Sequence, residues 1–185
     1  MTLRIALVVL ALGLAACNQQ SATQDAASDA PQLDAPAPDS EPSRVYAAAN
    51  DAARAVSAEL TVSVTQELPD AADADIQERL SLRGGNGLDV SAAVTGAISP
   101  ATQVGGQTLR ALLAIPVEEP QVLVYRVSAA AGAPGLCAGG GAPTHVVVWE
   151  PSAPGDGAMK ILGITGGAPG AGDSRACQML EYRRS

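Results

Sequence analysis

The chain has 185 residues, and its 19 acidic side chains outnumber the 11 basic ones to give a formal net charge of -8 at pH 7. An acidic chain without a basic run argues against nucleic acid or anionic lipid as the main partner. The chain contains no Phe, one Trp and three Tyr. It therefore lacks the aromatic platforms that sugar-binding and single-strand-binding surfaces usually need.

The N-terminus has the pattern of a secretory signal. Arg4 precedes an apolar run over residues 5–14, and Leu14-Ala15-Ala16-Cys17 follows. About ten apolar residues behind a positive charge are typical of an export signal and are too short to span a bilayer. We therefore expect residues 1–16 to be removed.

The tetrapeptide that ends in Cys17 resembles the lipobox of bacterial lipoproteins, in which the signal is cut before the cysteine. The resemblance implies a diacylglycerol on the Cys17 sulfur and a further acyl chain, such as palmitate, on its amino group. Several acyl chains make a durable membrane anchor. In that family an aspartate after the cysteine favours the inner membrane, so Asn18 favours an outer-membrane anchor with the domain in the periplasm.

The next segment, residues 17–43, has the composition of a tether. From residue 18 onward it is rich in Ala, Ser, Pro, Asp and Gln, has Leu33 as its only large apolar residue, and carries five acidic and no basic side chains. Such a segment cannot bury enough apolar surface to offset the entropy of ordering. We predict a disordered tether and a single β-rich domain over residues 44–185.

Two cysteines remain in the domain, Cys137 and Cys177. Disulfides persist in compartments outside the inner membrane, so these two are predicted to form a bridge. The alternative is a metal site in which both thiolates join His145, but no Cys-x-x-Cys pair or second histidine supports it.

The first half of the domain is predicted to contain a helix and three strands. Alanine-rich residues 44–58 favour a short N-terminal helix. Alternating apolar residues predict strands over 59–66, 78–83 and 88–98, with a helix as the alternative for 78–83 because Ile76 and Leu80 have helical spacing. The Gly-Gly-Asn-Gly sequence at 84–87 is typical of a hairpin turn between the last two.

The second half is predicted to be almost entirely strand. Residues 107–115 are apolar and strand-like, and four apolar segments over 122–127, 144–149, 159–164 and 177–182 predict an antiparallel meander. Short strands at this spacing indicate a mostly β domain, either a small antiparallel sandwich or a barrel, with one disulfide.

No set of residues with a clear catalytic pattern accompanies these strands. His145, the one histidine, shares a predicted strand face with Trp149, and the pair could form a ligand surface. The chain has no Gly-x-Ser-x-Gly elbow and no phosphate-binding loop, and we predict no cofactor or metal.

Three functional hypotheses remain. The first is a non-enzymatic module that binds an envelope component or protein, or serves envelope structure. The second is a hydrolase inhibitor similar to the lipoprotein lysozyme inhibitors, although their Ser-Gly-Ser-Gly-x-x-Tyr signature is missing and Gly163-Ile164-Thr165-Gly166-Gly167 does not match it. The third is an enzyme that relies on His145.

Overall fold

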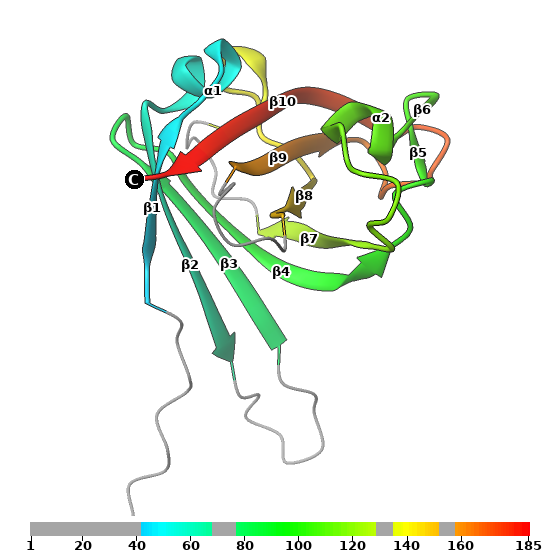
Figure 1. Cartoon of the computed structure of the whole chain (residues 1–185), viewed down its shortest axis with the longest axis horizontal. Coiled ribbons are helices and arrows are strands. Elements are labelled where there is room, and N and C mark those ends of the chain that lie inside the picture. Colours follow the sequence, from blue (N-terminus) through cyan, green and yellow to red (C-terminus); the bar gives the residue numbers. More distant parts are fainter. Residues whose placement is uncertain (1–41, 68–76, 129–134, 152–157) are drawn as a thin grey trace, which may run out of the picture. The chain divides into compact units, whose positions relative to one another are not determined.

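The computed structural model describes residues 42–67, 77–128, 135–151 and 158–185. The predicted signal, the predicted lipidation site Cys17 and nearly all of the predicted tether lie outside these ranges. The described strands form a closed antiparallel barrel in the order β1-β10-β9-β8-β7-β4-β3-β2 (Figure 1). They are β1 (Arg44–Ala48), β2 (Glu59–Glu67), β3 (Gln77–Gly84), β4 (Asp89–Ile98), β7 (Val122–Ser128), β8 (His145–Trp149), β9 (Ala158–Thr165) and β10 (Arg175–Arg184).

Strand β1 closes the barrel because it pairs on both of its edges. Tyr46 lies opposite Leu60 of β2 on one side and opposite Arg184 of β10 on the other. The fold is therefore mostly β, as the sequence predicts, and of the two predicted architectures it is the barrel. All eight barrel strands lie within residues 44–184, so a segment spanning residues 42–185 contains the complete barrel and its core.

The hairpin and the meander are both confirmed. Strands β3 and β4 pair around the 84–87 turn, where Gly87 has a φ of 85°, a value that glycine adopts without steric cost. Strands β7, β8, β9 and β10 pair consecutively, as a meander requires.

The helix predicted over residues 44–58 is wrong in its first half. Residues Arg44–Ala48 form β1, and the helix α1 spans only Asp51–Val56. Alanine favours helix weakly, and the open edges of β2 and β10 offer a full set of backbone hydrogen bonds to an extended segment. Asn50 then starts the helix, because its side-chain oxygen accepts a hydrogen bond from the Ala53 N–H at 2.8 Å.

The strand predicted over residues 107–115 is also wrong. Gln107–Thr108 form the short strand β6, which pairs with β5 (Gln103–Val104), and Leu109–Leu113 form the helix α2. The Thr108 hydroxyl accepts from the Ala111 N–H at 3.3 Å and caps this helix. Leu109 and Leu113, one turn apart, are both fully buried.

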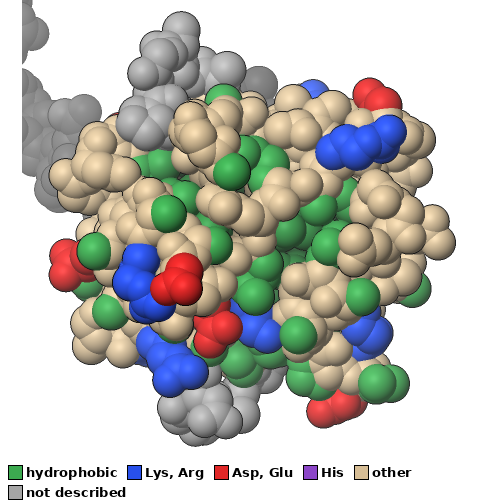
Figure 2. Space-filling model, turned by 90° about the horizontal axis from the view of Figure 1, so that it is seen from above, with side chains coloured by type: hydrophobic (Ala, Val, Ile, Leu, Met, Phe, Trp, Pro, Cys, Tyr) green, Lys and Arg blue, Asp and Glu red, His purple; other side chains and the backbone are tan. Residues whose placement is uncertain are grey.

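Apolar side chains form two separate cores. One fills the barrel and includes Tyr46, Leu60, Leu82 and Tyr182. The other lies outside the barrel, where α2 and its flanking residues cover β7, β8 and β9. In the view of Figure 2, hydrophobic side chains occupy the middle of the face, and a cluster of basic and acidic side chains lies beside them.

Helix α1 covers one end of the barrel (Figure 1). Its buried Ala53 and Val56 join the interior core. The Tyr182 hydroxyl lies 3.3 Å from the carbonyl oxygens of both Ala53 and Ser57, so it donates to the backbone at the end of this helix. We call the opposite end of the barrel, where β1 begins at Arg44, the mouth.

Replacing Asn50 with alanine should lower the free energy of unfolding by about 2–3 kcal/mol. Beyond the cap, the Asn50 amide donates to the Met179 carbonyl at 3.1 Å, and its oxygen lies 3.3 Å from the Glu181 N–H. The residue therefore fastens α1 to β10. Urea unfolding measures the change, and Asp51→Ala is the matched control because Asp51 is exposed and contacts only Arg54 through its side chain. Equal losses in the two variants would contradict this role.

Candidate functional site

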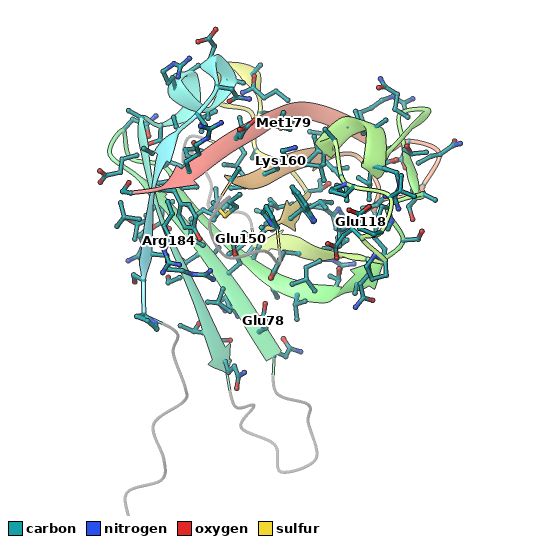
Figure 3. All side chains as sticks on the ribbon, in the orientation of Figure 1. Glu78, Glu118, Glu150, Lys160, Met179 and Arg184 are labelled. Carbon is teal, nitrogen blue, oxygen red and sulfur yellow. A yellow bond between two sulfur atoms is a disulfide. The ribbon has the colours of Figure 1, made fainter. Side chains whose placement is uncertain are left out.

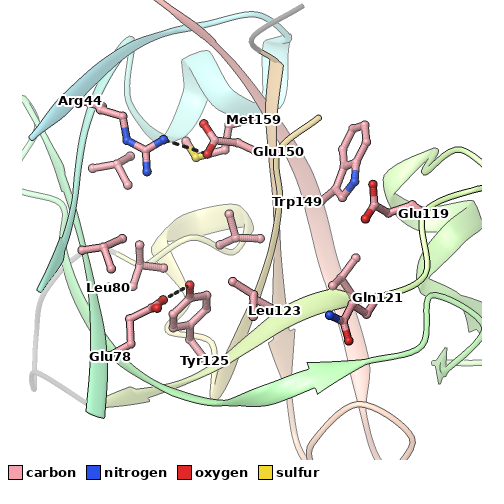
Figure 4. A pocket seen from close by; sticks show the side chains of 14 residues that line it. Arg44, Glu78, Leu80, Glu119, Gln121, Leu123, Tyr125, Trp149, Glu150 and Met159 are labelled. Carbon is pink, nitrogen blue, oxygen red and sulfur yellow. Dashed lines mark hydrogen bonds and ion pairs between the residues drawn. The ribbon is translucent and has the colours of Figure 1, made fainter. Parts of the chain in front are cut away.

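The mouth contains a cavity of about 320 Å³. Its apolar lining comes from inward-facing strand residues, namely Val62, Val64, Leu80, Leu123, Val148 and Met159. Its polar lining consists of Arg44, Glu78, Glu119, Gln121, Tyr125, Trp149 and Glu150 (Figure 4). A cavity with an apolar wall and a few polar groups is the usual form of a small-molecule site, and this volume is at the lower end of the range for such sites.

The cavity exists because inward-facing side chains fill the two ends of the barrel differently. Toward α1 the interior holds the bulky side chains of Tyr182 and Leu82, both fully buried. Toward the mouth, the inward faces of β2 and β8 carry the smaller side chains of Val64 and Val148. Smaller side chains leave space between the strands where larger ones would pack the barrel solid.

One wall of the mouth holds an ion pair between Arg44 and Glu150. Arg44 Nη1 lies 3.0 Å from Glu150 Oε2, and the Tyr46 hydroxyl donates to the other Glu150 oxygen. Burial, followed by the hydrogen bond to Glu150, raises the pKa of Tyr46 to about 12. Strand β1 thus contributes both partners of the Glu150 carboxylate, whose residue directly follows β8.

Another wall holds a carboxylate bonded to a phenol. The Tyr125 hydroxyl donates to Glu78 Oε1 at 2.7 Å, joining β7 to β3 across the barrel interior (Figure 4). Burial, and next the Glu78 hydrogen bond, raises the pKa of Tyr125. Among the described residues, no Lys or Arg lies within ion-pair distance of Glu78. Figure 3 shows Glu78 and Glu150 reaching the mouth from different parts of the barrel.

Trp149 lies at the edge of the cavity with an unsatisfied donor. Its side chain is buried, and its indole Nε1 has no acceptor among the described residues. The Lys160 ammonium lies 5.2 Å from the centre of the ring, a cation–π contact, and donates to the Leu113 carbonyl at 2.9 Å. These contacts fix the ring against α2, in the core outside the barrel.

His145 lies at the other end of β8 from Trp149. The two residues are the ends of this five-residue strand, so their backbones lie about 13 Å apart. The two predicted ligand residues therefore do not meet in one site. His145 is buried, and its Nδ1 lies 3.1 Å from the Thr144 hydroxyl. Burial, followed by the charge of Arg126, lowers the pKa of His145. Trp149 thus lies at the mouth cavity, and His145 does not line it.

Cys137 and Cys177 form the predicted disulfide. Both sulfurs are used in the bridge, which leaves no thiolate for the alternative metal site with His145. Within the described ranges, no three His, Cys, Asp or Glu side chains are grouped as metal ligands would be. Those ranges also contain no helix long and apolar enough to span a membrane.

Comparisons with protein-family models, with curated proteins and with solved structures found no match. The architecture of an eight-stranded barrel with an open mouth is therefore described from this chain alone.

The sequence analysis missed the polar residues of the mouth, although part of the signal was present. Glu78 alternates with Leu80 and Leu82, which places a carboxylate on the apolar face of a strand. Tyr125 is preceded by Leu123 two residues earlier on the same face. A charged residue in register with an apolar face indicates either a strand end or a polar site inside the barrel.

Proposed function

We propose that the protein is a non-enzymatic binding module of the bacterial envelope, anchored to the outer membrane through an acylated Cys17. The barrel lies in the periplasm and takes a small ligand with an apolar body into the mouth cavity. The mouth cavity is the observation that carries this proposal: it combines an apolar wall with polar groups that are held by partners from other strands.

The polar contacts of the mouth favour binding over catalysis. The Glu150 carboxylate is held by Arg44 and Tyr46, and Tyr125 donates its proton to Glu78. Both phenols have raised pKa values and remain protonated donors near neutral pH. Such groups orient a ligand by hydrogen bonding, and no described nucleophile is paired with a base at the cavity.

A bulky side chain in the mouth cavity should weaken the binding of a ligand there. Val64→Phe places a phenyl ring in the mouth, and we expect it to weaken binding of single-chain amphiphiles of eight carbons at least tenfold, because the ring occupies their space. Binding to residues 42–185 is measured by calorimetry, with n-octanol, n-octylamine and n-octanoate as probes. Val45→Phe is the matched control, since Val45 is exposed on the outer face of β1. If the wild-type barrel binds none of the three probes, the proposed function is wrong.

A further inference from the structure

We propose that the ligand of the mouth cavity is a small organic cation: an amine on an apolar body. This inference rests on the proposed function, and it assigns the ligand class from the charges of the cavity wall. Two observations carry it: a carboxylate whose side-chain partner among the described residues is a neutral hydroxyl, and an apolar middle of the cavity.

The carboxylate is Glu78. Of the two arginines near the mouth, Arg44 pairs with Glu150, and the charges of Arg44 and Arg184 both act on Tyr46. The charge of Arg44 also reaches the Tyr125 hydroxyl, but Arg44 forms no ion pair with Glu78 among the described residues. Glu78 receives only the Tyr125 hydroxyl among the described residues. A carboxylate has room for more than one donor, so its remaining acceptor sites can receive an ammonium group. The Tyr125 ring beside it adds an aromatic surface that also favours a cation.

The middle of the cavity is apolar. Leu80, Leu123 and Met159 contribute to its lining (Figure 4). An alkyl or similar body would bury its surface there, at about 25 cal/mol for each Å² removed from water. Among the described lining residues, an anion of the same shape would meet three carboxylates, Glu78, Glu119 and Glu150, and one cation, Arg44.

The charge preference is tested with octylamine, octanol and octanoate on residues 42–185. Octylamine should bind at least tenfold more tightly than octanol, and octanoate should bind most weakly. Glu78→Gln keeps an acceptor for Tyr125 and removes the charge, so it should reduce the preference for the amine over the alcohol to within twofold. Glu59→Gln, on the exposed outer face of β2, removes the same charge elsewhere and should leave the preference intact.

Equal binding of octylamine and octanol, or an unchanged preference in Glu78→Gln, would overturn the cation assignment while leaving a binding module in place. Absence of binding by every probe would overturn both.

Discussion

Replacing both Cys137 and Cys177 with alanine is expected to lower the free energy of unfolding by about 4 kcal/mol. The bridge closes a loop with a sequence separation of 40, and the constraint on the unfolded chain grows with the logarithm of that length. The total stability of a domain is usually about 5–15 kcal/mol, so the loss removes a large share of it. Urea unfolding of residues 42–185 measures the difference directly.

In the folded protein, the disulfide lies against Gly163 of β9. A Cβ at that position would lie 3.3 Å from the Cys137 sulfur and 3.4 Å from the Cys177 sulfur, so the bridge packs directly over the glycine. Alanine at both cysteine positions removes the bridge and adds no bulk there. Reduction of the wild type should shift its unfolding midpoint toward that of the variant, whereas the same reductant should leave the variant unchanged. A loss below about 1 kcal/mol would contradict the expected effect of the bridge on the unfolded chain.

Alternation predicted most barrel strands because each has one face inside the barrel. In β2, Leu60 and Val62 are buried while Glu59 is exposed, and that contrast is visible in the sequence. Strand β1 alternates in the same way, but its alanines have a weak preference for helix. Its extended form depends on partners far along the chain, since Tyr46 pairs with Arg184 of β10. Local propensity cannot contain that information.

The candidate site was less predictable than the fold because its contacts depend on strand order. Glu78 and Tyr125 are 47 residues apart and meet only because β3, β4 and β7 are neighbours in the barrel. Arg44 and Glu150 are 106 residues apart. The pairing of His145 with Trp149 failed for a simpler reason: residues on one strand face can lie far apart along it.

Above pH 10 the barrel should lose stability steeply and unfold in one step with ionisation of its tyrosines. The chain has three tyrosines, and each side chain is at most 3% exposed. Burial raises the pKa of Tyr46 and Tyr182 to about 12 and also raises that of Tyr125. A shift from 10 to about 12 corresponds to about 3 kcal/mol for each phenol.

The direction follows from proton binding. Below pH 10 the phenols are protonated in both states, and their full contribution to stability is present. Between pH 10 and about 12 the unfolded chain releases phenol protons that the folded barrel retains. The unfolded state then binds fewer protons, so the free energy of unfolding falls as the pH rises. Tyr46 and Tyr182 alone account for about 5–6 kcal/mol, enough to unfold a domain of ordinary stability.

Phenolate absorbance and circular dichroism, recorded together during a pH titration, provide the measurement. The two signals should change at the same pH, with no phenolate forming near pH 10 while the barrel remains folded. Tyr182→Phe keeps the buried ring and removes one of the three ionising groups, so the pH dependence of the unfolding free energy should decrease by about a third. A tyrosine that ionises near pH 10 in the folded state would contradict the burial of its hydroxyl. If that residue were Tyr125, the donor assigned to Glu78 would also be lost, because a phenolate cannot donate to a carboxylate.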